Sequence, residues 1–277
     1  MENKMAYGAL RGFALLASTL LAPQLLLADG VADNVAADAT NKAYRLMAES
    51  EQRDEGWVDN RSEMQMIIRR GDGREIVREL RTQALEGASG EDKSLMVFDE
   101  PLDVRGTVFL THSYPLNPDD QWIYLPSQNK VKRISSKRRN GRFMGSEFTF
   151  EDMAAFALEE NDYIYLRQEA CDELQCHVIE VRPKDKYSGY EKFIYYMDVE
   201  ELRAWRIEFY DKRTGKHVKT MTMSNYQRYL DKFWRAEQAT MRNMVSGAET
   251  EIRWRKEAFR TGMSEQDFSK TALERRQ

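Results

Sequence analysis

The chain has 277 residues, of which 32% are charged and 11% aromatic, and its formal net charge is −4. This mixture excludes intrinsic disorder over most of the chain, and the mild acidity argues against a dedicated nucleic-acid binder. The length suits one β-rich domain, since single sandwiches and barrels often reach about 200 to 250 residues.

Residues 1–28 have the pattern of a secretory signal peptide. Lys4 and Arg11 supply positive charge, residues 13–27 supply an apolar core, and Ala28 is a small residue at the expected cleavage point. Polar residues and a proline interrupt the core, which argues against the alternative of an uncleaved membrane anchor. No cysteine lies directly after the apolar core, where it could accept a lipid anchor. We therefore expect a periplasmic protein that is exported with a cleaved signal peptide.

Residues 29–37 are small and polar, and they predict a flexible leader before a single domain at 38–277. Residues 38–52 predict a helix, because Ala43 and Met47 follow helical spacing and Asp38 is a suitable cap.

Most of the remaining sequence predicts strands, because apolar and polar residues alternate and short turns such as Gly71-Asp72-Gly73 separate the runs. The expected strands are 63–68, 75–85, 94–98, 106–113, 121–125, 130–135, 163–169, 176–183, 190–198, 203–211, 216–224, 234–244 and 249–259. Residues 151–159 predict a short helix, and residues 264–273 a tail or short helix. Without a βαβ rhythm, the pattern indicates an antiparallel meander.

Cys171 and Cys176 are the two cysteines of the chain. In an oxidising compartment such a close pair most often forms a disulfide. A redox site is the alternative, but the spacing is not C-x-x-C. His177 adjoins Cys176, but no further cysteine or histidine pair completes four ligands, so we expect no metal site.

Catalytic motifs such as G-x-S-x-G, H-E-x-x-H and the Walker A loop are missing from the sequence. His112, His177 and His217 lie on separate expected strands. We therefore expect a protein that is not an enzyme and needs no cofactor. The alternative is a periplasmic hydrolase with a carboxylate pair that the sequence does not reveal.

One face of several expected strands carries large apolar side chains, which either pack in a core or line a ligand cavity. Methionine is abundant, with 14 residues, and suits a lining that adapts to variable chains. The candidate lining residues are Met64, Met66, Ile68, Val108, Leu110, Trp122, Tyr124, Ile194, Tyr196, Trp205, Ile207, Phe209, Met221 and Met223.

The segment 143–153 carries apolar side chains on a backbone that glycine and serine interrupt: Phe143, Met144, Phe148, Phe150 and Met153. Apolar groups on a mobile loop predict a lid over an apolar cavity. The alternative is a loop that folds onto the core.

A dense basic run precedes this loop: Lys130, Lys132, Arg133, Lys137, Arg138, Arg139 and Arg142. It has three interpretations. The run is a solvated hairpin, it contacts anionic lipid headgroups at a membrane surface, or it docks an acidic patch on a transporter.

Three segments carry a family resemblance. They are W-x-Y-L-P from Trp122 with the R-I-S-S and F-M-G-S-x-F that follow, the strand at 176–184, and the ending F-S-K-T-A-L-E-R from Phe268. Together they resemble the LolA-like outer-membrane lipoprotein-sorting proteins, in the branch found beside RND-type exporters. The resemblance covers about residues 37–276. It implies a mainly β fold, a curved and incompletely closed antiparallel sheet (a half-barrel) with a few helices over its concave face.

The resemblance also implies a carrier that holds the acyl chains of a lipoprotein or a free lipid, hopanoid-like or otherwise, and shuttles between inner and outer membrane. An RND-type inner-membrane transporter would be its partner, with transient contact to a membrane surface. The chain is longer than classical members, so the cargo stays open. A non-carrier adaptor of a transporter complex is the alternative, and a real cavity would discriminate against it.

Overall fold

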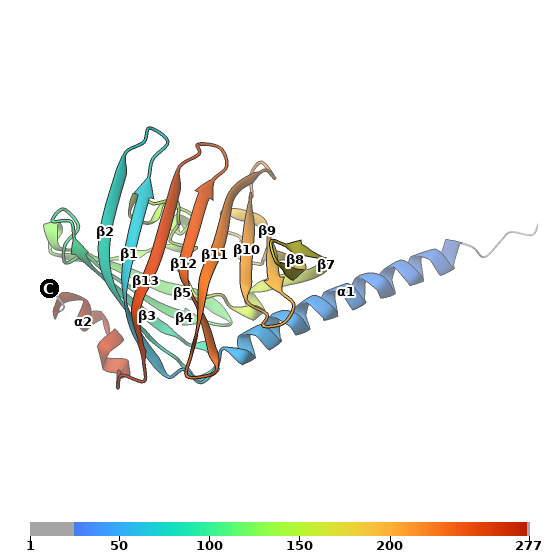
Figure 1. Cartoon of the computed structure of the whole chain (residues 1–277), viewed down its shortest axis with the longest axis horizontal. Coiled ribbons are helices and arrows are strands. Elements are labelled where there is room, and N and C mark those ends of the chain that lie inside the picture. Colours follow the sequence, from blue (N-terminus) through green and yellow to red (C-terminus); the bar gives the residue numbers. More distant parts are fainter. Residues whose placement is uncertain (1–24, 276–277) are drawn as a thin grey trace, which may run out of the picture. The chain divides into compact units, whose positions relative to one another are not determined.

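The computed structural model of the protein describes residues 25–275 (Figure 1). The expected signal peptide up to residue 24 lies outside the described residues. The chain divides into two compact units after Ala37, and the unit from Asp38 onward contains the whole sheet.

Helix α1 covers Leu25–Arg53. Its second half confirms the helix expected at 38–52. Residues 29–37 were expected as a flexible leader but are helical, which fits a segment rich in alanine, a strong helix former, and free of proline. The boundaries of the signal peptide and of the domain stay predictions.

Thirteen strands form one antiparallel sheet within the described residues. They are β1 Asp59–Arg69, β2 Glu75–Leu85, β3 Lys93–Glu100, β4 Val108–Tyr114, β5 Asn117–Leu125, β6 Lys130–Ile134, β7 Asn161–Cys171, β8 Leu174–Pro183, β9 Tyr190–Asp198, β10 Ala204–Asp211, β11 His217–Tyr229, β12 Phe233–Asn243 and β13 Glu249–Phe259. Each expected strand is confirmed, with the expected ends in β2, β9 and β13 and shifted ends in the others. Strand β11 runs five residues beyond the expected Ser224, which lengthens its hairpin with β12.

The strand order is β6-β5-β4-β3-β2-β1-β13-β12-β11-β10-β9-β8-β7. Two meanders, β1–β6 and β7–β13, meet where β1 pairs with β13, and Met66 lies opposite Ile252 there. The two edge strands, β6 and β7, do not pair with each other. The sheet is therefore an open half-barrel, as expected (Figure 1).

Apolar side chains cover both faces of the sheet. On β3, Met96 and Phe98 belong to the core of the inner face, whereas Leu95 and Val97 alternate with them onto the outer face. The second half of α1 packs Ala43 on the inner face of β7–β9.

The C-terminal segment covers the outer face instead. The 3-10 turn Glu265–Phe268 and helix α2 (Lys270–Arg275) bury Phe268 and Leu273 over β3–β5. The helix expected at 264–273 is thus present in part, and it stabilises the face away from the inner core.

The helix expected at 151–159 is absent, and turns lead instead into a 3-10 turn at Leu158–Glu160. Glu151 accepts hydrogen bonds from the Ser188 hydroxyl and the Gly189 backbone N–H. Asp152 accepts one from the Tyr190 hydroxyl at 2.8 Å. These tertiary bonds hold the segment in an irregular path, so they outweigh its helical propensity.

A candidate ligand cleft on the inner face

A cleft of about 1560 Å³ lies between the second half of α1, residues 155–159, the β2–β3 and β9–β10 turns, and the β11–β12 hairpin. It is larger than the roughly 300 to 1,000 Å³ typical of pockets for small ligands. Both the helix and the irregular segment that replaces the expected second helix contribute to its walls.

Apolar side chains form one part of a cleft lining that is otherwise largely polar. Met47, Phe156, Tyr195, Leu202 and Met223 line the cleft, and Trp234 and Tyr226 extend the lining along the β11–β12 hairpin. Tyr195 and Met223 also pack against the inner core, so this apolar part of the lining is continuous with that core. The Phe156 side chain is 47% exposed although it lies against Tyr163 and Tyr195, with ring centroids 6.4 Å away in both cases.

Polar bonds fasten the C-terminal end of α1 over this cleft. The Ser50 hydroxyl donates to the Leu202 carbonyl at 2.8 Å, and the Arg53 guanidinium donates to the Glu200 carbonyl at 2.9 Å. Arg235 forms an ion pair with Asp54 on the opposite side. The Arg53 contact is exposed and the other two are only partly buried, so this end of the helix is held less firmly than a packed core.

Carboxylates crowd the mouth of the cleft. Burial raises the pKa of Glu51, and the negative charges of Glu159, Glu55 and Asp92 raise it further. These groups come from α1, from the β2–β3 turn and from the segment after residue 155. The apolar part of the cleft is therefore reached past a rim that is acidic on this side.

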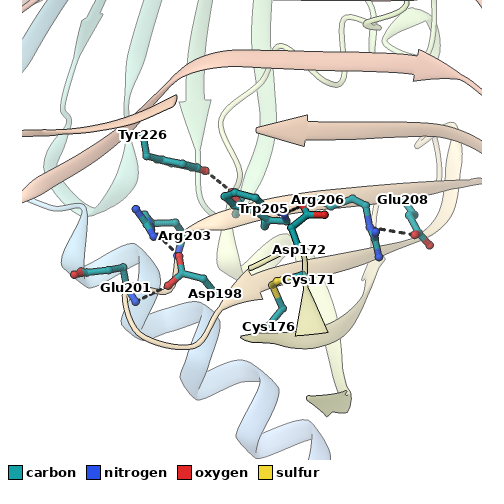
Figure 2. The surroundings of a disulfide bond; sticks show 11 residues. Cys171, Asp172, Cys176, Asp198, Glu201, Arg203, Trp205, Arg206, Glu208 and Tyr226 are labelled. Atoms are coloured by element: carbon teal, nitrogen blue, oxygen red, sulfur yellow. Dashed lines mark hydrogen bonds and ion pairs between the residues drawn. A yellow bond between two sulfur atoms is a disulfide. The ribbon is translucent and has the colours of Figure 1, made fainter. Parts of the chain in front are cut away.

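The β9–β10 turn, which forms one wall, is built around the buried carboxylate of Asp198 (Figure 2). That carboxylate accepts hydrogen bonds from the backbone N–H groups of Glu201 and Arg203, and from the Arg203 Nε at 2.8 Å. The Arg203 guanidinium lies 4.5 Å from the Trp234 ring centroid and 5.0 Å from that of Tyr226. This network fixes the wall together with the buried side chain of Leu202.

The disulfide braces the same turn. Cys171 and Cys176 are bonded across the β7–β8 turn, with their Cα atoms 5.9 Å apart, as expected. From that turn, Asp172 accepts a hydrogen bond from the Trp205 indole at 2.7 Å (Figure 2). At the start of β8, the backbone carbonyl of Gln175 accepts one from the Val199 N–H.

The apolar loop 143–153 is part of the inner core. Phe143 is fully buried and its ring contacts Phe98, Phe109 and Phe150 at centroid distances of 6.1, 5.1 and 5.4 Å. Phe148 is 3% exposed. Of the two interpretations of this segment, the structure has the loop folded onto the core rather than on a mobile rim.

Charged groups anchor that loop to the sheet beneath it. The Lys219 ammonium donates to the Asp152 carboxylate at 2.9 Å and to the Glu147 carbonyl at 3.2 Å. The Glu147 carboxylate pairs with Arg142 and accepts a hydrogen bond from the Asn243 amide at 2.8 Å. Sequence reasoning missed this network. A signal existed, because Lys219 precedes Met221 and Met223 at alternate positions on an otherwise apolar face.

The structure separates the predicted lining residues into three groups. Those in the inner core or packed against it are Met64, Met66, Ile68, Phe143, Met144, Phe148, Phe150, Met153, Ile207, Phe209, Met221 and Met223. Those on the outer face beneath α2 are Val108, Leu110, Trp122 and Tyr124. Those beside the disulfide on the outer face are Ile194, Tyr196 and Trp205.

The outer-face residues point away from the cleft, so the expectation that they line it is corrected. Alternation reveals that a strand has an apolar face but not which way that face points, and here both faces are covered. Of the predicted set, Met223 borders the cleft directly. Met47, Phe156 and Tyr195 were missed, because their place depends on contacts between distant segments.

Three arginines of the basic run form ion pairs with carboxylates. Arg139 is buried and pairs with Asp185 at 2.5 Å, Arg142 pairs with Glu147 at 2.9 Å, and Arg133 pairs with Asp120. Arg139 is the buried member, and the exposed members are Lys130, Lys132, Arg133, Lys137, Arg138 and Arg142.

Within the described residues, no group of three or more His, Cys, Asp or Glu side chains is arranged to hold a metal ion. The same part of the chain contains no helix with the length and apolar character needed to cross a membrane.

Solved structures of other proteins share this open antiparallel half-barrel. A LolA superfamily protein from Nitrosomonas europaea, 21% identical, shares the fold with a TM-score of 0.67 over 83% of this chain and 98% of that chain. A family model described only as "-like: Uncharacterized protein" matches residues 90–275. A search of curated proteins finds no match.

Two solved structures are more similar. A domain assigned to the outer membrane lipoprotein-sorting proteins, from Vibrio parahaemolyticus, is 41% identical, with a TM-score of 0.83 over 85% of this chain and 99% of that chain. A DUF1329 family protein from Desulfovibrio piger is 31% identical, with a TM-score of 0.80 and the same coverage. The chain belongs to the outer membrane lipoprotein-sorting protein family.

Proposed function

We propose that this protein is a periplasmic carrier that holds the acyl chain of a lipoprotein, or a free lipid, in the inner-face cleft. The observation that carries the proposal is the cleft itself, whose apolar lining residues Tyr195 and Met223 also pack against the inner core. Binding would be non-covalent, and the protein would act without catalysis. A hollow of this size favours a carrier over an adaptor with a filled core.

Hydrophobic burial supplies the driving force. Each buried methylene contributes about 0.8 kcal/mol, so hiding a 16-carbon chain from water is worth roughly 12 kcal/mol. The carboxylates at the mouth of the cleft stay hydrated, while the apolar part of the lining holds the acyl chain.

Admission of the ligand would involve the parts of the cleft that are held least firmly. These are the C-terminal turn of α1, which polar bonds near the surface hold, and the segment that carries the half-exposed Phe156. The loop 143–153 would stay in place, because buried bonds to Lys219 and Asn243 hold it. This mechanism replaces the lid predicted from the sequence.

The resemblance of the 122–153 and 268–276 segments to the exporter-linked LolA-like branch supports two further parts of the proposal. An RND-type inner-membrane transporter would load the cleft, and the outer membrane would receive the cargo. The signal-like residues 1–28 support export to the compartment between the two membranes.

The test is native mass spectrometry of the protein purified without detergent, followed by extraction and identification of any lipid. Ala236→Trp fills the cleft, where Ala236 is a lining residue. Ala258→Trp is the matched control, because Ala258 lines a separate hollow of about 410 Å³ among polar residues.

We expect a discrete lipid mass on the parent protein and on the control, and its loss from Ala236→Trp. A ligand-free mass after incubation with membrane extract would refute the carrier function. Equal lipid retention by both variants would refute the assignment to this cleft.

A further inference from the structure

The turn between β12 and β13 displays two apolar side chains to solvent. Val245 is 81% exposed and Met244 is 50% exposed. Asn243 holds the turn rigidly, since its side-chain oxygen accepts hydrogen bonds from the N–H groups of Val245 and Ser246 at 2.9 and 3.0 Å. The Asn243 amide in turn donates to the buried Glu147. The apolar pair is therefore presented on a fixed support, although nothing in the turn geometry requires apolar residues.

Cationic turns flank this apolar pair on both sides. The β1–β2 turn lies against it, because a Cβ at Gly71 would sit 2.9 Å from the Ser246 carbonyl oxygen. On the other side, the Met244 N–H donates to the Val218 carbonyl, at the start of β11. Figure 1 shows these three turns side by side at one end of the sheet. We call them the turn rim: residues 70–74, 211–216 and 244–247.

The charge of the turn rim is strongly positive. The turn rim carries two carboxylates, Asp72 and Asp211, and five cations: Arg70, Arg74, Lys212, Arg213 and Lys216. Asp72 is occupied by the Arg74 side chain at 2.5 Å. Asp211 is turned into its own hairpin, where it accepts from the Thr214 hydroxyl at 2.8 Å and from two backbone N–H groups. Glu191 is the exposed carboxylate nearest to this hairpin.

An apolar tip between cations matches the interface of a membrane, where the cations meet anionic headgroups and the tip enters the acyl boundary. We infer that the turn rim is a peripheral docking site for an anionic lipid bilayer, with Met244 and Val245 inserted. An acidic protein surface would use the cations but would leave the exposed Val245 unexplained.

Docking by the turn rim orients the molecule. The cleft is lined by turns at the other ends of the same strands, including Leu202 in the β9–β10 turn and Arg228 at the far end of β11. The bound protein would therefore hold its cleft away from the bilayer, open toward a protein that projects from the membrane. The site does not depend on the proposed carrier function, because none of its residues lines the cleft.

The experiment is co-sedimentation of the purified protein with vesicles of phosphatidylethanolamine and phosphatidylglycerol, and with neutral phosphatidylcholine vesicles. Arg213→Gln with Lys216→Gln removes two charges whose side chains make no bonds in the described structure. Met244→Gln with Val245→Thr keeps the shape of the tip and removes its apolar character. The matched controls are Arg61→Gln with Lys256→Gln, and Leu116→Gln, which is 79% exposed on the β4–β5 turn.

We expect binding to anionic vesicles that weakens about 5-fold for each lost charge, hence about 25-fold for the charge pair. The variant with Met244→Gln and Val245→Thr should bind anionic vesicles about 10-fold more weakly. The controls should bind like the parent, and all variants should retain any lipid carried in the cleft. The inference is overturned if the parent does not bind anionic vesicles or if both rim variants bind them like the parent. It is also overturned if the control variants lose as much affinity as the rim variants.

Discussion

At the scale of single residues, the Lys219–Asp152 pair is the clearest buried electrostatic contact, with side chains 9% and 4% exposed. Lys219→Met would leave the Asp152 carboxylate buried without its cation. We expect a loss of about 3 to 5 kcal/mol in the free energy of unfolding, measured by urea denaturation. The double variant, Lys219→Met with Asp152→Asn, should lose less stability than the two single variants lose in sum. Additive losses would show that the pair is not coupled.

A second residue-scale prediction concerns pH. Burial, followed by the charge of Asp119, raises the pKa of Glu160 to about 7. A carboxyl with a raised pKa binds more protons folded than unfolded, so it makes stability fall as pH rises from about 4.5 through 7. Glu160→Gln should therefore flatten this fall and be more stable than the parent at pH 8. Urea denaturation at pH 5, 6, 7 and 8 measures this dependence, with Glu173→Gln at an exposed position as control. A parent whose stability does not decline in this window would contradict the prediction.

At the scale of elements, the disulfide stabilises the β7–β8 hairpin that braces one wall of the cleft. Closing so short a loop is worth about 2 kcal/mol. Cys171→Ser with Cys176→Ser should lower the melting temperature under oxidising conditions and should match the reduced parent. Hydrogen exchange should rise first at Val199, whose N–H is bonded to Gln175. A parent that melts at the same temperature in its oxidised and reduced forms would show that the bridge adds little.

The elements also show what the sequence could predict. The strands and the disulfide were found because alternation, turns and cysteine spacing are local signals. The helix expected at 151–159 was wrong, since distant bonds to Ser188 and Tyr190 override local propensity. The cleft lining was mostly missed for the same reason. Met47 and Tyr195 come together only when α1 packs on β9, and no pattern within either segment predicts that contact.

At the scale of the whole molecule, the two meanders depend on the pairing of β1 with β13. Ile252 is 1% exposed at this junction and packs in the inner core, which draws residues from both meanders. Ile252→Ala should therefore cost about 2 to 5 kcal/mol and preserve a single unfolding transition. Native-state hydrogen exchange should show the same loss of protection in β4 and in β9. Loss confined to one meander would mean that the halves fold independently, and that the junction merely joins two stable sheets.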